Sequence, residues 1–373
     1  MAHNDGSALE IKIPNKVHPL AKVIALFVGI RVGVLLILIT LSSVNHRSFY
    51  TSFTRWDAQW YRRIAENGYG YIYHHPDGRS LRDYAFFPFY PFLERATHSI
   101  TTMNVINSGI LISVISSVIA ATGIYRISHY LYGDRVAVIS VALWGLIPVG
   151  VVQWLAYSES LFTALAVWSL YFILRKRFLR AALLASLAGG TRPVGLAVVV
   201  AVVISLLVEL RRGWSFRLLA SLAIAPLGLL GYMEWVNIRL GSSSGYFSVA
   251  KGWGNTFDGG VSFFTWIIHG SVFRGVALSC AVVGLLILLW TLIRQNQPLP
   301  LLIFAGVIVF VALTTSGYFG SKPRYLLPVF PLLFPFARSI SARTNRVVVL
   351  ILGALGIATG IYGALWLLGS GPL

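Results

Sequence analysis

The sequence LAKVIALFVGIRVGVLLILITLSS, residues 20–43, is followed after a short gap by RWDAQWYRRIAENGY, residues 55–69. The first stretch is apolar and long enough to cross a hydrocarbon core about 30 Å thick. The second stretch is charged and rich in aromatic side chains, as expected of a segment at the boundary between membrane and water. Together they predict a membrane span followed by a loop that carries the chemistry of the protein.

The composition of the chain agrees with this interpretation. Hydrophobic residues make up 57% of its 373 residues, charged residues make up 11%, and the mean hydropathy is +0.75. These values lie outside the range of soluble globular proteins, and apolar runs of span length recur along the sequence. We therefore expect an all-α, polytopic integral membrane protein.

Eleven apolar runs are predicted to cross the membrane. They cover residues 20–43, 105–125, 136–153, 158–174, 179–190, 193–209, 217–238, 271–293, 300–316, 325–338 and 346–368. Basic clusters fall in alternate loops, which predicts that these loops and the N-terminal leader, 1–19, are cytoplasmic. Residues 20–373 are expected to form one transmembrane domain with two larger outer loops, 44–104 and 239–270.

The few carboxylates of this basic chain gather in the first outer loop. Only 12 residues are Asp or Glu, against 30 Lys or Arg, so the net charge is +18. The basic excess sets the membrane orientation and suits anionic membrane lipids or lipid phosphates, so nucleic acid is not expected as a partner. Five of the twelve carboxylates lie between residues 44 and 104, namely Asp57, Glu66, Asp77, Asp83 and Glu94.

The loop is expected to begin with a short amphipathic helix. Trp56, Trp60 and Ile64 recur every four residues and would form one helical face resting in the membrane interface. Thr54 precedes Asp57 by three residues, the spacing of a capping box, and Asn67-Gly68 is a typical helix stop. Asp57 could therefore satisfy the helix start, act as a catalytic carboxylate, or do both.

An aromatic block with two prolines, residues 83–91, follows in the same loop. It could anchor the loop as an interfacial aromatic belt, or form the wall of a groove for a lipid tail or sugar rings. The neighbouring His74 and His75 could ligate a metal, but adjacent loop histidines are more often solvated. No carboxylate pair has clear ligand spacing, so no cofactor is assigned and a requirement for a divalent metal stays open.

These motifs, in this order, resemble those of the GPI mannosyltransferase 2 family, which adds the second mannose in GPI-anchor assembly, and its prokaryotic relatives. The resemblance rests on Trp56-Asp57 with Tyr61, 64–66 and 68–69, on 85–88 with Pro91, and on the later blocks 157–162, 191–196 and 324–328 with Pro331. The Trp-Asp block followed by Ala-Phe-Phe-Pro is the most specific part.

The resemblance implies a GT-C glycosyltransferase, an integral-membrane enzyme that uses a polyprenyl-phosphate-linked sugar, usually mannose. It implies inverting transfer on the outer or lumenal face, with Asp57 as the base that takes a proton from the acceptor hydroxyl. The outer loops are shorter than those of the eukaryotic enzymes. We therefore expect a prokaryotic plasma-membrane protein whose acceptor, a glycan, a lipid or a protein, is open.

A lipid phosphate is an anionic leaving group, so cations on the same side are expected to bind it. The candidates are Arg192, Lys322 and Arg324. Arg192 lies in a Gly-Gly-Thr-Arg-Pro break between runs that form either two crossings or a re-entrant pair, and irregular backbone at membrane depth indicates a lined cavity. It could instead snorkel to the interface, and the two other cations could belong to a solvated turn.

Three further residues complete the candidate site. Trp56 precedes the catalytic aspartate, Asp83 begins the aromatic block, and Glu159 lies in a short outer turn. For Glu159, capping of the next helix after Ser158 competes with a role in orienting Arg192.

Two other function classes remain open from the residues. A transporter or flippase of lipid-linked intermediates would fit the number of spans, although the sequence has no inverted repeat and its carboxylates lie outside rather than at mid-membrane. A non-catalytic scaffold is disfavoured by the clustering of outer acids and aromatic residues. Within enzymes, transfer of another sugar from the same carrier is the alternative.

Overall fold

The computed structural model describes residues 17–46 and 48–369, and most of them are helical. Five helical segments are long and apolar enough to cross a membrane. They are α1 (Val17–Val44), α5 (Val105–Tyr132), α9 (Leu196–Leu210) with the preceding turn η3 (Pro193–Gly195), α14 (Val272–Arg294) and α18 (Asn345–Leu368). Each satisfies its backbone hydrogen bonds internally, which is what a hydrocarbon environment requires.

Two further pairs of apolar helices are sharply bent. The helix α6 (Asp134–Gly145) meets the turn η2 (Pro148–Trp154) at 80°, and α10 (Phe216–Ile224) meets α11 (Leu227–Leu240) at 42°. Counting each pair once gives up to seven candidate spans among the described residues. The apolar helices α7 (Glu159–Leu174), α8 (Phe178–Gly189) and α15 (Leu299–Thr314) are shorter, so the predicted number of eleven is not confirmed.

The predicted span 325–338 is wrong as a single helix. This region consists of α16 (Lys322–Tyr325), η5 (Phe330–Leu333) and α17 (Phe334–Ser341). Prolines recur at positions 323, 328, 331 and 335. Proline removes an amide donor and clashes with the preceding helical turn, so the chain bends instead of crossing.

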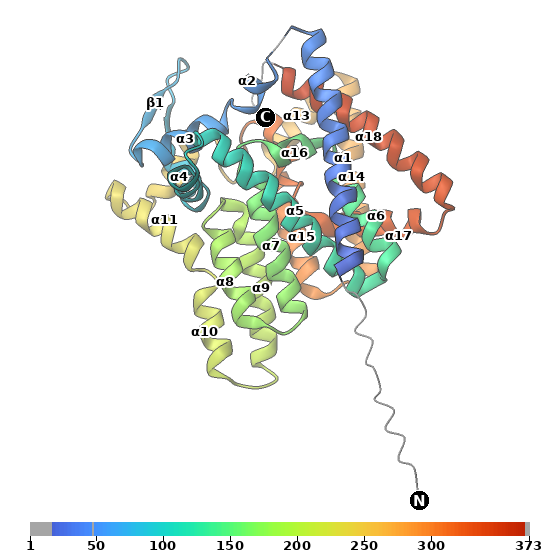
Figure 1. The fold of residues 1–373 in the computed structure, drawn as a ribbon. Helices are drawn as coiled ribbons and strands as arrows, with labels where there is room; N and C mark the ends of the chain where they lie inside the picture. Colours follow the sequence, from blue (N-terminus) through green and yellow to red (C-terminus); the bar gives the residue numbers. More distant parts are fainter. Residues whose placement is uncertain (1–16, 47, 370–373) are drawn as a thin grey trace, which may run out of the picture.

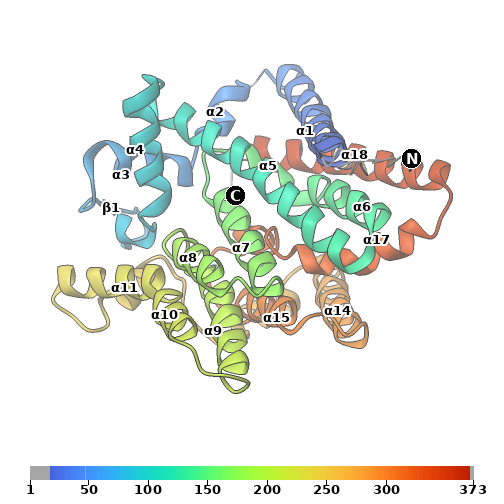
Figure 2. The ribbon, with the colours of Figure 1, turned by 60° about the horizontal axis from the view of Figure 1, so that its bottom comes forward.

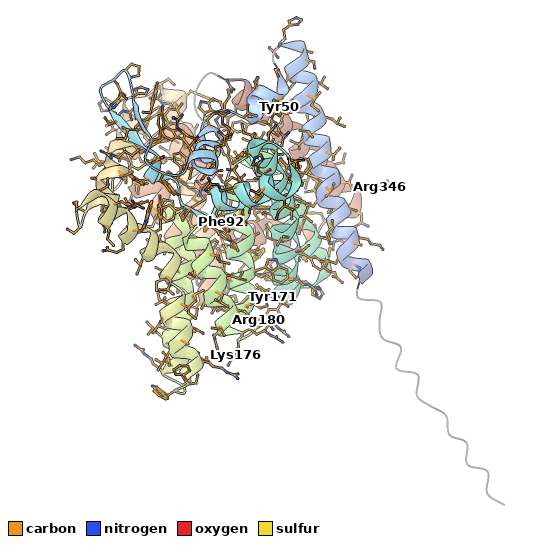
Figure 3. All side chains as sticks on the ribbon, turned by 60° about the vertical axis from the view of Figure 1, so that its left-hand side comes forward. Tyr50, Phe92, Tyr171, Lys176, Arg180 and Arg346 are labelled. Carbon is orange, nitrogen blue, oxygen red and sulfur yellow. The ribbon has the colours of Figure 1, made fainter. Side chains whose placement is uncertain are left out.

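The helices pack around α5 and α7, as Figures 1 and 2 show. The helix α7 packs against α5 and α8, α9 packs against α15, and α1 packs against α18. The core between them contains large, fully buried rings, including Trp144, Phe162 and Phe304. Lys176 and Arg180 lie at one end of this bundle, and Tyr50 lies at the opposite end (Figure 3).

The segment predicted as the first outer loop folds into a small cap at the end marked by Tyr50. It contains α2 (Phe49–Phe53), α3 (Asp57–Asn67), the hairpin β1 (Ile72–His74) and β2 (Ser80–Arg82), η1 (Asp83–Ala85) and α4 (Phe89–Thr101). The hairpin is antiparallel, with Tyr73 opposite Leu81. The second predicted outer loop contains α12 (Gly245–Gly252) and α13 (Val261–Ile268), and α12 contacts β2 and η1.

The predicted amphipathic helix exists, but its cap and its packing differ from the prediction. Trp56 takes the N-cap position with φ 52° and Asp57 is the first helical residue, so the predicted capping box is wrong. The helix ends as expected, with the Gly68 amide donating to Ile64. The Trp60 ring stacks on Phe86 at 5.5 Å because the aromatic block folds back over α3.

Candidate active site

Four charged side chains from four separate segments meet at one end of the bundle. Arg324 Nη1 lies 2.7 Å from Asp57 Oδ2 and 3.4 Å from Glu159 Oε1. Arg192 Nη1 lies 2.7 Å from the same Glu159 oxygen. The result is a chain of alternating charges, Asp57–Arg324–Glu159–Arg192. The sequence predicted all four residues as site candidates, and the structure brings them together.

Asp57 is held by the backbone at the start of α3. The preceding residue, Trp56, has φ 52° and ψ −117°, a conformation that costs a non-glycine residue energy and is found where surrounding structure enforces it. The Asp57 side chain is 22% exposed, whereas that of Glu159 is 1% exposed. Asp57 is therefore the carboxylate of the cluster that an incoming molecule can reach.

Glu159 begins α7, directly after the short segment that follows η2. The hydroxyl of Ser158 accepts a hydrogen bond from Arg192 Nη1 at 3.0 Å and lies 2.7 Å from the hydroxyl of Tyr61. Ser158 thus serves the cluster instead of capping α7, which corrects the competing interpretation of this turn. The ring of Tyr157 lies 5.3 Å from the Arg324 guanidinium.

Arg192 lies in the break between α8 and η3, as the sequence predicted. Its side chain is only 11% exposed and is directed at Glu159, so the snorkelling alternative is wrong. Close backbone packing forms this break, since a Cβ on Gly195 would come within 2.7 Å of the Ala188 carbonyl oxygen. The carbonyl of Gly190 accepts a hydrogen bond from the amide of Phe89, which ties the break to α4.

Two predicted site residues lie outside the cluster. Lys322 Nζ donates to the carbonyl oxygens of Ala312, at 3.0 Å, and Thr315, so it holds the end of α15. Asp83 is fully buried and accepts hydrogen bonds from the amides of Gly70 and Tyr71, each at 2.9 Å. Both side chains turn toward nearby backbone groups, a local contact that spacing in the sequence did not reveal.

The carboxylates keep both arginines charged despite their burial. Burial acts to lower the pKa of Arg324, but Asp57 and then Glu159 outweigh it and raise this pKa. Burial likewise opposes the charge of Arg192, whose pKa is raised chiefly by Glu159. Burial also raises the pKa of Tyr61, so its hydroxyl is neutral. The site therefore presents two fixed cations, one accessible carboxylate and neutral hydroxyls.

Sequence reasoning did not place Tyr61 or Ser158 in the site, although their hydroxyls complete the hydrogen-bonded cluster. Both lie inside the motifs that carry the resemblance, and Tyr61 follows Asp57 by four residues, on the same face of α3. This four-residue spacing could have predicted that Tyr61 lies beside Asp57. The contact with Ser158 joins residues 97 positions apart, so only the folded chain shows it.

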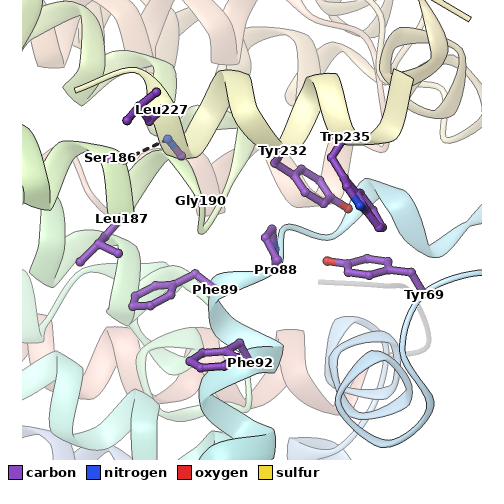
Figure 4. Close-up of a pocket in the computed structure, with 11 residues that line it drawn as sticks. Tyr69, Pro88, Phe89, Phe92, Ser186, Leu187, Gly190, Leu227, Tyr232 and Trp235 are labelled. Carbon is purple, nitrogen blue, oxygen red and sulfur yellow. Dashed lines mark hydrogen bonds between the residues drawn. The ribbon is translucent and has the colours of Figure 1, made fainter. Parts of the chain in front are cut away.

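An apolar cavity of about 520 Å³ lies between α4, α8 and α11 (Figure 4), and the four charged residues of the cluster are not in its lining. Phe89 and Phe92 line one side, and Tyr69, Tyr232 and Trp235 gather on another. Its wall also includes Gly190, two residues before Arg192. The predicted aromatic block contributes Pro88 and Phe89, so it forms part of a groove wall.

The proposed metal ligation by His74 and His75 was compared with the side chains of residues 17–46 and 48–369. In these ranges no group of three or more His, Cys, Asp or Glu side chains is placed to hold a metal ion. His75 Nδ1 lies 2.8 Å from Asp77 Oδ1, and His74 Nδ1 lies 3.1 Å from the Ser80 hydroxyl. Each histidine therefore contacts a polar side chain of the hairpin.

A family model described as dolichyl-phosphate-mannose-protein mannosyltransferase matches residues 75–236. No curated protein matches the chain.

Two solved structures share the fold. ArnT from Cupriavidus metallidurans bound to undecaprenyl phosphate is 17% identical with a TM-score of 0.51, and the match covers 81% of this chain and 57% of ArnT. The archaeal oligosaccharyltransferase AglB from Archaeoglobus fulgidus, in complex with an inhibitory peptide and a dolichol-phosphate, is 16% identical with a TM-score of 0.51, covering 93% and 56%. The chain thus spans just over half the length of either protein. It is a multi-pass membrane protein that shares their fold.

Proposed function

We propose that this protein is an inverting glycosyltransferase that moves a sugar from a polyprenyl-phosphate donor to an acceptor hydroxyl at the outer face of the membrane. The observation that carries the proposal is the ion cluster, in which a reachable carboxylate, Asp57, shares a site with two buried arginines. The fold shared with ArnT and AglB and an apolar cavity whose wall includes Gly190 support it.

Asp57 is the base in this proposal. An inverting single displacement requires one carboxylate to take the proton of the acceptor hydroxyl as that oxygen attacks the anomeric carbon. Asp57 is 22% exposed and is held by a helix start, so it can meet an acceptor without reorganising. Glu159, at 1% exposure, has the complementary task of holding both guanidinium groups in place.

Arg192 and Arg324 receive the leaving phosphate. The anomeric carbon–oxygen bond breaks toward a phosphate that is already anionic, so cations stabilise the departing group without an acid. ArnT and AglB were solved with undecaprenyl phosphate and dolichol-phosphate, which supports this donor class.

The apolar cavity suits the isoprenoid chain of the donor. Its lining is dominated by aromatic and aliphatic side chains, as expected of a site for a hydrocarbon ligand. Gly190 in its wall lies two residues before Arg192, so the proposal requires the lipid phosphate to extend past Gly190 to the arginines. Helix breaks at α8–η3 and α10–α11 shape this region, and irregular backbone at membrane depth is tolerated where it lines a cavity.

Mannose is the sugar we propose. The description of the matching family model names a dolichyl-phosphate-mannose donor, and the motifs around Asp57 resemble a mannosyltransferase family. The acceptor would be a lipid, glycan or protein on the outer face of a prokaryotic plasma membrane. Other sugars on the same carrier fit the cation cluster equally, since the arginines would contact the phosphate.

The test is transfer of radiolabelled mannose from a polyprenyl-phosphate donor by purified protein in detergent, with a lipid and glycan extract as acceptor. Asp57→Asn should lower turnover by about a thousandfold or more, because the base is lost. Asp77→Asn is the matched control, since Asp77 is an exposed carboxylate of the hairpin that pairs with Arg79 at 2.7 Å. Wild-type-like turnover by Asp57→Asn would remove Asp57 from the mechanism.

The same assay separates the enzyme from a flippase. In detergent there is no membrane to cross, so a transporter would give no glycosidic product. Product formation that depends on Asp57 would exclude transport as the only activity. Absence of product with every polyprenyl-phosphate sugar tested would overturn the proposal.

A further inference from the structure

The break between α6 and η2 frees backbone carbonyl groups inside the bundle. α6 ends at Gly145, and η2 begins at Pro148 and runs off at 80°. A helix that ends leaves its last carbonyl oxygens without intrahelical donors, and proline cannot supply an amide hydrogen. Within a membrane such oxygens must find partners in the protein, because no water is available.

Three side chains from three different segments supply those partners. Gln153 Nε2, on η2, donates to the Trp144 carbonyl at 3.0 Å. Arg31 Nη1, on α1, donates to the Gly145 carbonyl at 3.3 Å. Thr359 Oγ1, on α18, donates to the Leu146 carbonyl at 2.6 Å. We call these three donors, Arg31, Gln153 and Thr359, the carbonyl cap, and all of them are buried.

Arg31 is the charged member of the carbonyl cap and contacts both sides of the break. Within the described ranges no carboxylate lies within 4.0 Å of it, so its counter-charge is the negative end of the α6 dipole. On the other side its guanidinium lies 5.5 Å from the Trp154 ring centre, and a Cβ on Gly150 would be 3.1 Å from Nη1. Intramembrane arginine is costly and is retained where it has a task.

The segment that Arg31 contacts leads straight to the ion cluster. η2 ends at Trp154, and Tyr157, Ser158 and Glu159 follow. The Ser160 hydroxyl donates to the Gln153 carbonyl at 2.7 Å, which joins the start of α7 to the carbonyl cap. The direction in which η2 leaves the break therefore determines where the Glu159 carboxylate lies between the two arginines.

We propose that Arg31 is a positioning residue for the transfer reaction. By capping α6 and contacting η2, it fixes the bend that delivers Glu159 to Arg192 and Arg324. This inference rests on the proposed function for its kinetic consequence, but its structural consequence can be measured without any assay of activity.

The kinetic test is a double-mutant cycle between Arg31→Met and Glu159→Gln. Arg31→Met should lower kcat at least tenfold, while Arg31→Lys, which can still donate to a carbonyl, should recover most of the loss. Because Arg31 acts through Glu159, adding Arg31→Met to Glu159→Gln should cost little more. The inference would be overturned if the double variant lost kcat by the product of the two single losses, or if Arg31→Met were fully active.

A milder variant and a matched control guard against general misfolding. Thr359→Val keeps the shape of the side chain but removes the donor to the Leu146 carbonyl. It should lower kcat a fewfold, and it should cost little more when it is added to Glu159→Gln. Ser128→Ala removes a buried hydrogen bond between α5 and α6, where the Ser128 and Ser140 hydroxyls lie 3.0 Å apart, away from the break. It should leave kcat unchanged.

Hydrogen exchange followed by mass spectrometry separates this inference from the proposed function. In detergent, Arg31→Met should increase exchange of the backbone amides over residues 145–160, and Arg31→Lys should not. Unchanged protection there would overturn the positioning role even if the enzyme is active. Increased exchange in a protein that makes no glycosidic product would leave the positioning role standing and remove only the proposed reaction.

Discussion

Two buried glutamates, one in the ion cluster and one at the α4–α5 interface, show what distinguishes a site from a buried charge. Glu159 is 1% exposed and lies within 3.4 Å of two arginines. Glu94 is fully buried, and in the described part of the chain no Lys, Arg or His nitrogen lies within 4.0 Å of its carboxyl oxygens. A Cβ on Gly109 would come within 2.2 Å of Glu94 Oε1, so the carboxyl packs tightly on α5.

The lack of a neighbouring cation has a physical consequence at Glu94. Burial, and then the charge of Glu66, raises the pKa of Glu94 well above its usual range. A buried carboxyl without a cation is more stable as the neutral acid. Glu159 instead stands between two guanidinium groups that remain charged. Burial without a cation thus favours the uncharged form of Glu94, whereas the two arginines of the ion cluster stay charged beside their carboxylates.

The sharpest test of this comparison replaces each glutamate by glutamine. Glu159→Gln should lower sugar transfer by about a hundredfold, because two buried arginines lose the carboxylate that orients them. Glu94→Gln should leave turnover within about twofold of wild type, since glutamine resembles the neutral acid in shape. Turnover of both purified variants with a saturating polyprenyl-phosphate sugar measures the difference, and equal losses would contradict it.

A second test addresses the geometry of the cations. Arg192→Lys and Arg324→Lys keep the charge but lose the planar fork, so the KM for the donor should rise by about tenfold. Lys322→Met is the control, because Lys322 holds carbonyl oxygens of α15 outside the cluster. A donor KM that is unchanged in both arginine variants would show that charge alone is sufficient at this site.

A third test uses the pH dependence of stability. The folded-state pKa of Glu94 is raised above that of the unfolded chain. The contribution of Glu94 to the free energy of unfolding is therefore fully present below the unfolded pKa of about 4.3. This contribution is lost as the pH rises from about 4.3 through the folded-state pKa. The Tm of the wild type in detergent should therefore fall as the pH increases over this window, and Glu94→Gln should flatten the slope.

The smallest expected effect concerns Lys322 itself. Removing its ammonium group leaves the carbonyl oxygens of Ala312 and Thr315 without this donor, so Lys322→Met should lower the free energy of unfolding by about 1–3 kcal/mol. Sugar transfer should change little. Thermal unfolding alongside turnover checks both expectations, and a large loss of transfer at unchanged stability would return Lys322 to the candidate site.

Most residues of the candidate site could be predicted from the sequence, and the wrong predictions have physical causes. Asp57, Glu159, Arg192 and Arg324 were identified as charged or motif residues on one predicted side of the membrane, and they meet in the structure. Lys322 and Asp83 satisfied the same criteria. Their side chains turn to nearby backbone groups instead, and spacing along the chain does not give the direction of a side chain.

Apolar length and charge are local properties of each segment, so the amino-acid sequence alone predicts a helical membrane protein with five of its twelve acids in one loop. The pairing of the charges, in contrast, can be seen only in the folded chain. The contact between Asp57 and Arg324 joins residues 267 positions apart, while Glu159 follows the α6–η2 break and Arg192 lies in the α8–η3 break. The direction of the chain after a break is fixed by packing and by donors on other helices, so local sequence can predict a break but not where it delivers a side chain.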